Sequence, residues 1–394
     1  LAAQFDRYGE VAVIDLDAAL GRGDNRALIA DLLRVADCRV GGGIRTVEQA
    51  REWIALRAHK VIVGSVAFQD DRVNHAFLRE LAEAISPQRL IIAIDARDGE
   101  IVTRGWTHRT GLDLYETVPA LDPYAGEFLF TCVEREGMMQ GVDMAAIRRV
   151  RETTTRQLTA AGGITTLDEV ARLASIDVDV QAGMALYTGQ LDLAGGFIAA
   201  LNWKSDLLPT MVQDTAGQVL MVAYSSRESL RESFARGEMC YFSRSRQRLW
   251  HKGETSGHVQ RLLRLRADCD RDTLLATVEQ AEVACHTGSY SCFGPQRFSL
   301  DRLYRIVEER LTQAPEGSYT ARLRDDTLLA EKILEEAREV VDAPTRDNLV
   351  WEAADLLYFL TARLAKAGIT FDEVEHELYR RRWQSRRPEG ESDP

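Results

Sequence analysis

The sequence is poor in several features, and each shortage excludes a class of protein. Six cysteines in 394 residues are too few for a disulfide scaffold. No run approaches the roughly 18 consecutive apolar residues of a transmembrane helix, and the opening LAAQFDRYGEV lacks the basic-then-apolar order of a secretory signal. Acidic residues outnumber basic ones by 61 to 49, and no long basic patch offsets the net charge of −12. We therefore expect a cytoplasmic chain with neither nucleic acid nor membrane as a partner.

What the sequence contains is enough for several domains. The composition is ordinary for a globular protein, with 45% hydrophobic and 28% charged residues. At roughly 150 residues per domain, the length predicts two or three domains. The patterns divide the chain into residues 1–201, 202–297 and 298–394. The first residue is Leu rather than Met, which we interpret as a processed or truncated start.

Residues 1–201 alternate short β-branched runs with segments of helical period, such as Asn25–Val35 and Thr46–Ala55. Alternating βα units predict a parallel sheet. Seven runs are strand candidates, namely 11–15, 38–40, 60–64, 90–95, 128–131, 157–161 and 178–183.

An internal repeat runs through this region. GGGIRT (41–46) returns as AGGITT (161–166), and VGSVA (63–67) is echoed by AGMAL (182–186), both at about 120 residues. In a (β/α)₈ barrel, glycine-rich turns that lead into helices bind phosphate through backbone N–H groups. A duplicated pair would hold a substrate with two phosphates, although each glycine pair could also be only a tight turn. The candidate phosphate-binding residues are Gly42, Gly43, Gly64, Ser65, Gly162, Gly163 and Gly183.

The region resembles the ProFAR isomerases of histidine biosynthesis, through VIDLDAALGRGDN (13–25), IIAIDARDG (91–99), RGW (104–106), TCVEREGMMQGVD (131–143) and the repeated glycine motifs. The resemblance implies a (β/α)₈-type barrel that catalyses an Amadori rearrangement, with Asp95 at the position of the catalytic acid. Trp106 matches a tryptophan that closes over the ligand. Two features depart from the family. The first strand and its catalytic aspartate are missing, and Glu136-Gly137 replaces an Asp-Gly pair.

The middle region concentrates metal-binding residue types. Cys269, Cys285 and Cys292 supply three thiolates, and three protein ligands plus water is the arrangement of catalytic zinc. Asp268, Asp270 and Asp272 alternate, so in a strand they would share one face, where three carboxylates favour a hard cation such as Mg²⁺. Cys269 would then point to the other face and would require the other two cysteines from elsewhere, including from a partner chain.

Other residues of the middle region suit catalysis and phosphate binding. His286 adjoins a predicted zinc ligand and is a natural general acid and base. The KGETSG turn, together with two nearby arginines, suits a phosphate; the candidates are Arg244, Arg246, Lys252, Gly253 and Glu254. The alternative is a purely structural zinc module with a solvated acidic strand.

This set resembles the phosphoribosyl-AMP cyclohydrolases, through SRSR (243–246), KGETSGH (252–258), DCDRD (268–272) and ACHTG (284–288) with SCF (291–293). The resemblance implies an α+β metal-binding domain that forms a homodimer. It further implies Zn²⁺ shared across the interface, Mg²⁺ at the three aspartates, and hydrolytic opening of the purine ring with His286 handling protons.

The last region is helical, with expected helices at 301–311, 325–343, 348–368 and 371–383. Leu334, Ala337, Val340 and Val341 form an apolar stripe. The adjoining face and the next helix carry carboxylates at helical spacing, which favours Mg²⁺ between antiparallel helices over a merely solvated acidic face. The candidate ligands are Glu335, Glu336, Glu339, Glu352 and Asp355.

EGSYTARL (316–323), EKILEEAREV (331–340) and EAADLLYFL (352–360) resemble the phosphoribosyl-ATP pyrophosphohydrolases. The resemblance implies an all-α, Mg²⁺-dependent domain, and Phe359 stands where that family usually has a histidine. The polar tail after Arg382 is expected to be disordered.

The three resemblances together predict a multidomain enzyme of histidine biosynthesis. It would hydrolyse phosphoribosyl-ATP, then open the purine of phosphoribosyl-AMP, and isomerisation of ProFAR by the barrel is an additional possibility. Two alternatives stay open. The barrel could be a non-catalytic module for dimerisation or bis-phosphate binding, and the helical region could be a general nucleotide pyrophosphohydrolase.

Overall fold

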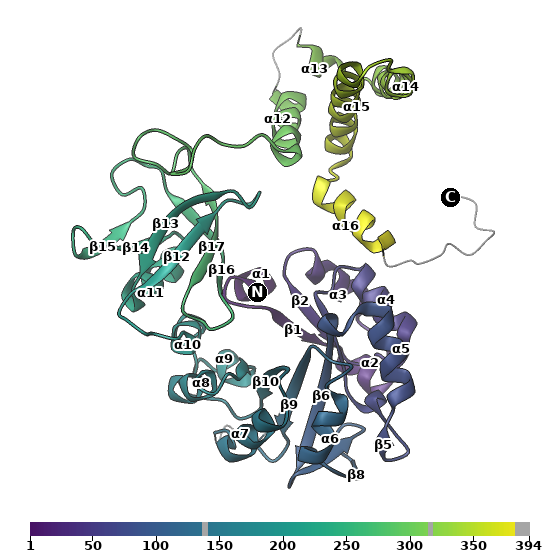
Figure 1. Ribbon diagram of the computed structural model, residues 1–394, viewed down its shortest axis with the longest axis vertical. Helices are drawn as coiled ribbons and strands as arrows, with labels where there is room; N and C mark the ends of the chain where they lie inside the picture. Colours follow the sequence, from purple (N-terminus) through teal and green to yellow (C-terminus); the bar gives the residue numbers. More distant parts are fainter. Residues whose placement is uncertain (136–140, 314–317, 383–394) are drawn as a thin grey trace, which may run out of the picture. The chain divides into compact units, whose positions relative to one another are not determined.

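The computed structural model describes residues 1–135, 141–313 and 318–382. The chain forms two compact units, Leu1–Pro295 and Gln296–Pro394 (Figure 1). Three sequence-based expectations fall outside the described residues: the Glu136-Gly137 departure, the first two residues of EGSYTARL, and disorder of the tail beyond Arg382. None of the helices in the described ranges combines the length and the apolar character that crossing a lipid bilayer requires.

The first unit begins with the expected parallel sheet. Its seven parallel strands follow chain order, so each strand is paired with the next of the series. Within the described residues the two end strands do not pair with each other, and the sheet is open between them, as for a barrel that lacks a strand. The strands are β1 (Val11–Ile14), β2 (Cys38–Gly41), β3 (Lys60–Val63), β6 (Leu90–Arg97), β9 (Glu127–Cys132), β10 (Gln157–Ala161) and β11 (Asp179–Gln181).

Helices lie between the strands, and α3, α4 and α5 flank the first strands in Figure 1. Two of them begin in the same way. Thr46 caps α4 and Thr166 caps α8, each in a capping box with the side chain three residues on. The helices are α1 (Ala2–Asp6), α2 (Leu16–Leu20), α3 (Arg26–Leu33), α4 (Val47–Ala55), α5 (His75–Ile85), α6 (Leu114–Leu121), α7 (Met144–Thr153), α8 (Leu167–Ala174), α9 (Met184–Tyr187) and α10 (Leu193–Ala200).

Short elements decorate this sheet. An antiparallel extension of β6 brings a loop back over the strand ends, because β7 (Glu100–Thr103) pairs with β6 and β8 (His108–Asp113) pairs with β7. A two-stranded hairpin, β4 (Phe68–Gln69) and β5 (Arg72–Val73), follows β3. Two 3₁₀ turns, η1 (Ser65–Ala67) and η2 (Pro87–Arg89), complete the region.

The second part of this unit is an antiparallel-rich sheet with one helix. Its core includes Ile198 and Leu201 from the end of the barrel region, packed with side chains such as Leu220 and Leu262. The two regions therefore share a hydrophobic core around residue 200. The elements are β12 (Leu208–Gln213), β13 (Val219–Ser225), α11 (Arg227–Arg236), β14 (Cys240–Ser243), β15 (Arg248–His251), β16 (Gln260–Ala267) and β17 (Leu274–Gln280).

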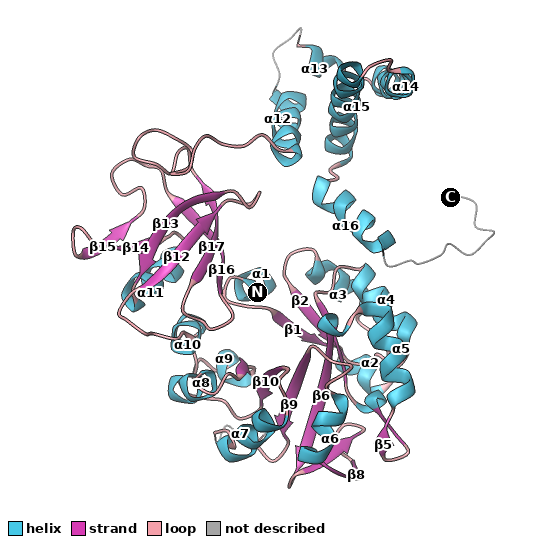
Figure 2. Cartoon of the chain, in the orientation of Figure 1, coloured by secondary structure: helices cyan, strands magenta, loops and turns pink. Residues whose placement is uncertain are grey.

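The second unit contains helices alone in its described residues (Figure 2). Its core gathers Val307, Leu329, Phe359 and Ala362. Two residues of the apolar stripe on α14 are exposed within this unit, Leu334 at 58% and Val341 at 82%, while Ala337 and Val340 are partly buried. The helices are α12 (Leu300–Gln313), α13 (Tyr319–Arg322), α14 (Asp326–Asp342), α15 (Arg346–Ala367) and α16 (Phe371–Arg382).

Candidate active sites

Asp95 lies near the carboxyl end of β6, directly opposite Thr131 on β9. Burial raises the pKa of the Asp95 carboxyl, and hydrogen bonds from the side chains of Trp106 and Thr131 only partly offset this effect. A carboxyl that holds its proton above the ordinary pKa is suited to act as an acid. Thr131 was not among the predicted residues, although the end of a strand beside Asp95 was a signal that could have found it.

The loop that carries Trp106 is fixed over the strand ends. The backbone N–H of Arg104 donates to the Ser65 hydroxyl at 2.8 Å, and the Thr107 hydroxyl donates to the Arg104 carbonyl at 2.7 Å. Trp106 remains 38% exposed. The indole is thus anchored at Asp95 and still open to solvent, as a side chain that covers a ligand would be.

The two glycine motifs have matching backbone geometry. Gly42 and Gly162 both have φ of 91°, while Gly43 and Gly163 have 74° and 76°. A Cβ on Gly42 would lie 2.2 Å from the Asp15 carbonyl oxygen, so no other residue fits this turn. Gly64 and Gly183 also agree, at φ/ψ of −117/−104° and −122/−97°, and each precedes a short helix. The geometry fits a duplicated half-barrel, and phosphate binding at these turns stays a prediction.

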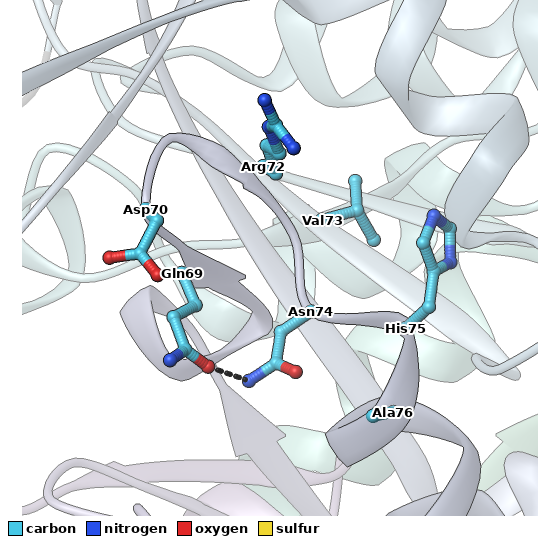
Figure 3. Close-up of a pocket in the computed structure, with 7 residues that line it drawn as sticks. All are labelled: Gln69, Asp70, Arg72, Val73, Asn74, His75 and Ala76. Carbon is cyan, nitrogen blue, oxygen red and sulfur yellow. Dashed lines mark hydrogen bonds between the residues drawn. The ribbon is translucent and has the colours of Figure 1, made fainter.

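An open hollow of about 430 Å³ lies elsewhere, on the β4–β5 hairpin and the start of α5. Figure 3 shows the Asn74 amide directed at Gln69, to which it donates a hydrogen bond of 3.2 Å. The hollow contains none of the predicted site residues, and its lining has neither paired carboxylates nor thiols. We assign it no catalytic role. It is lined by Gln69, Asp70, Arg72, Val73, Asn74, His75 and Ala76.

The expectation that Asp268, Asp270 and Asp272 lie on a strand was wrong. β16 ends at Ala267 and β17 begins at Leu274, so the aspartates occupy the turn between them. The turn forms because the Asp268 carboxylate accepts the backbone N–H groups of Asp272 and Thr273, both at 3.1 Å. The three carboxylates nevertheless converge, with one oxygen from each within 4.8 Å of the others. Three hard oxygen donors this close together fit Mg²⁺.

Sequence reasoning missed the basic residues of this acidic turn. The Lys204 ammonium lies 2.5 Å from an Asp272 oxygen and 3.3 Å from an Asp270 oxygen, which is a cation placed among the carboxylates. Arg271, within the DCDRD motif, turns away from them toward the barrel region. A basic residue inside an acidic motif was visible in the sequence, but its partner was not.

The three cysteines do not come together within one chain. Cys285 and Cys292 share a hydrogen bond, while Cys269 is exposed on the acidic turn and belongs to no metal-sized cluster among the described residues. A hydrogen bond from Thr287 lowers the pKa of Cys285, which favours the thiolate that zinc requires. His286 is exposed, with Nδ1 3.9 Å from the Cys285 sulfur. The pair Cys285 and Cys292 fits as part of a zinc site that needs a further ligand.

The predicted phosphate-binding residues surround a tight turn. Gly253 has φ of 89°, and a Cβ there would lie 2.6 Å from the backbone of His258. The buried Lys252 donates to the His258 carbonyl at 3.3 Å. Burial lowers the pKa of the Lys252 ammonium, and the negative charges of Cys292 and Cys285 act in the opposite direction. Arg246 lies 3.8 Å from Glu254.

Aromatic rings support the two arginines. The guanidinium of Arg244 lies 3.7 Å from the centre of the Tyr224 ring, and that of Arg246 lies 5.3 Å from the centre of the Trp250 ring. Both arginines are exposed, so their donors are directed by stacking and stay accessible to an anion.

In the second unit, carboxylates from two helices converge. Glu336 on α14 meets Glu352 and Asp355 on α15, with one oxygen from each within 4.8 Å of the others. Burial raises the pKa of Glu336, and the charges of Glu339 and Asp355 add to the effect. Glu339 shares a hydrogen bond with Glu352. Such crowding of like charges, with Glu336 only 6% exposed, fits a divalent cation.

Two other residues singled out by the sequence, Glu335 and Phe359, lie outside this carboxylate cluster. Glu335 turns to Lys332, with an ion pair of 2.7 Å, so its carboxylate is not in the three-residue group. Phe359 is a core residue that meets Tyr319 edge-on, with ring centres 6.2 Å apart. The Tyr358 hydroxyl shares a hydrogen bond of 2.7 Å with Thr320, which ties α15 to α13.

Three protein families match the chain in the expected order. The model described as histidine biosynthesis protein matches residues 1–192, phosphoribosyl-AMP cyclohydrolase matches 221–294, and phosphoribosyl-ATP pyrophosphohydrolase matches 300–382.

Named relatives agree with this order. The histidine biosynthesis bifunctional protein HisIE of Thermotoga maritima is 44% identical over 194 residues, which are 45% of this chain and 98% of that protein. HisIE of Bacillus subtilis is 44% identical over 197 residues, covering 46% of this chain and 94% of that protein. The histidine biosynthesis trifunctional protein of Saccharomyces cerevisiae is 42% identical over 190 residues, which are 48% of this chain and 24% of that protein. Through its cyclohydrolase and pyrophosphohydrolase regions, the chain belongs to the HisIE family of histidine biosynthesis enzymes.

Proposed function

We propose that the chain catalyses two successive hydrolyses. The helical unit would cleave phosphoribosyl-ATP to phosphoribosyl-AMP and pyrophosphate, and the middle region would then open the purine ring to give ProFAR. The observation that carries this proposal is the convergence of Glu336, Glu352 and Asp355 from two helices, in a chain that belongs to the HisIE family.

In the helical unit, the three carboxylates would hold Mg²⁺, which when bound offsets the charge of a polyphosphate. Because Glu336 is buried against α15, it is positioned by packing as well as by charge. Glu339 bridges to Glu352 and orients it.

In the middle region, Cys285 and Cys292 would hold Zn²⁺ together with Cys269 of a second copy in a homodimer, and the aspartates of the acidic turn would hold Mg²⁺. Bound zinc supplies an activated water for hydrolysis at neutral pH. His286, beside the Cys285 thiol, is in reach of a group at the zinc position and would take up and return protons. Arg244, Arg246 and the Lys252–Gly253 turn with Glu254 would orient the phosphoribosyl group.

The test is one incubation of the purified 394-residue chain with phosphoribosyl-ATP, Mg²⁺ and Zn²⁺, with the products separated by chromatography. We expect ProFAR to accumulate. Formation of the rearranged ribulosyl isomer would add an isomerase activity with Asp95 as its acid. Persistence of phosphoribosyl-ATP, with turnover of ordinary nucleoside triphosphates instead, would contradict the first step.

Two variants test whether the zinc of the middle region is catalytic or only structural. We expect His286→Ala to stop the chain at phosphoribosyl-AMP while the protein remains folded and retains its zinc. If His286→Ala still yields ProFAR and Cys285→Ser unfolds the region, the zinc is structural.

A further inference from the structure

Arg271 connects the acidic turn to the barrel region. Its side chain is only 15% exposed. One terminal nitrogen donates to the Ala174 carbonyl at 2.9 Å, and the other donates to an Asp179 oxygen at 2.8 Å. Ala174 ends α8 and Asp179 begins β11, so both partners belong to the last βα units of the barrel.

The partners of Arg271 are themselves fixed. Asp179 also accepts a hydrogen bond of 2.7 Å from the Gln157 side chain on β10, and Asp177 lies 3.7 Å from the guanidinium. Charge-assisted hydrogen bonds to a shielded guanidinium are stronger and more directional than those of an exposed ion pair. Arg271 is therefore held at the end of α8, at the turn that follows it and at the first residue of β11.

The opposite side of the turn is held by the segment that follows α10. The backbone N–H of Asn202 donates to the Arg271 carbonyl at 2.9 Å, and its side-chain amide donates to the Asp270 carbonyl at 3.2 Å. The backbone between the candidate Mg²⁺ ligands Asp270 and Asp272 is thus bound on both sides by residues of, or directly after, the barrel region.

Further contacts join the same two regions. Asp6, at the end of α1, is 4% exposed and lies 2.9 Å from a terminal nitrogen of Arg266 on β16. The next residue, Arg7, accepts the backbone N–H of Leu265 at 2.9 Å through its carbonyl. Since β16 leads directly into the acidic turn, these contacts fix the strand that carries it.

We propose that the barrel region serves as a brace for the cyclohydrolase metal site, with Arg271 as the positioning residue. This inference rests on the proposed function of the acidic turn as a Mg²⁺ site. A turn held by its neighbours loses less conformational freedom when it binds a cation, so the brace raises metal affinity without contributing a ligand.

The test compares full-length variants, each carrying Glu336→Gln so that the helical cluster is impaired. Mn²⁺ alone is the probe, titrated calorimetrically, and hydrogen exchange of the 268–273 amides is followed by mass spectrometry. We expect Arg271→Ala to weaken Mn²⁺ binding about tenfold and to accelerate exchange at the turn. Arg271→Lys keeps the positive charge but loses the two-pronged guanidinium. Its Mn²⁺ affinity and exchange rate should lie between those of the chain with Arg271 and those of Arg271→Ala.

Two further variants make the result specific. Asp179→Asn removes the negative charge that Arg271 contacts on the barrel side. It should weaken Mn²⁺ binding and accelerate exchange in the same direction as Arg271→Ala, and it provides the test if Arg271→Ala does not fold. Arg261→Ala is the matched control, because this β16 arginine is 62% exposed and forms its ion pair with the exposed Glu279 on the neighbouring strand. It should leave Mn²⁺ affinity and exchange unchanged.

Unaltered Mn²⁺ affinity and unaltered exchange in both Arg271→Ala and Asp179→Asn would overturn the brace. This outcome is distinct from failure of the proposed function, which would appear as a wild-type chain that leaves phosphoribosyl-AMP intact. The hydrogen-exchange readout requires no substrate.

Discussion

Two adjacent glutamates on α14 have different surroundings, although the sequence predicted both of them as metal ligands. Glu336 is buried among carboxylates, whereas Glu335 is about half exposed and pairs with Lys332. We expect Glu336→Gln to lower pyrophosphate release from phosphoribosyl-ATP on the order of 100-fold, because it removes a ligand charge from the cluster. Glu335→Gln, the matched control, should stay within about threefold, since exposed ion pairs contribute little.

A coupled assay for pyrophosphate measures both variants, and chromatography of added phosphoribosyl-AMP checks that the second hydrolysis persists. Equal losses in the two variants would contradict the division between the glutamates. The sequence could not predict this difference, because helical spacing alone does not show which of the two glutamates forms an ion pair with Lys332.

The three aspartates of the acidic turn also show what the sequence could and could not predict. Asp268, Asp270 and Asp272 lie close together, but in a turn rather than on a strand, and their binding of Mg²⁺ stays a prediction. The alternation suited a strand, yet the Asp268 side chain captures two backbone N–H groups and closes a turn instead.

At the scale of elements, the turn after β2 depends on glycine. Gly42→Ala would place a Cβ 2.2 Å from the Asp15 carbonyl, at a φ of 91° that L side chains rarely adopt. We expect a loss of about 1–3 kcal/mol in unfolding free energy of the first unit, measured by urea denaturation. Gly9→Ala is the control, because its Cβ would have no neighbour within 4 Å, and it should shift stability by less than about 0.5 kcal/mol. Equal midpoints for the two variants would contradict this role of Gly42.

Elements with a strong period were the ones that sequence reasoning found. All seven parallel strands appear at the expected places, since buried β-branched runs between helical segments have few other solutions. The β7–β8 extension was missed, because the buried run in β7 is only three residues long and β8 is largely exposed without a regular alternation. The RGW motif it carries was found only through the family resemblance.

At the scale of the whole molecule, the cysteines predict how two copies combine. If Cys269 of one chain completes the zinc site of the other, a Cys269→Ser chain and a Cys285→Ser chain are each inactive in purine opening. Co-expressed, they should regain about one quarter of wild-type activity, because half of the dimers are mixed and each mixed dimer has one intact site of two. A mixture as inactive as either variant would contradict the shared site. Zinc content, measured on the same samples, should follow the activity.

The order of the three regions could be read from the sequence, but the contact between the first two could not. Arg271 and Asp179 are 92 residues apart, and nothing in either motif indicates the other. Pairing over such separations is decided by the packing of whole regions, here by a core that runs from Ile198 and Leu201 into the following sheet.

The Arg271–Asp179 contact also has an evolutionary consequence. If the acidic turn binds a metal ion as proposed, a substitution at Asp179 would alter that site, so selection for cyclohydrolase activity would also act on residues of the barrel region. The residues of α8 and β11 that meet Arg271 would then be retained under selection even in a lineage whose barrel no longer catalysed any reaction.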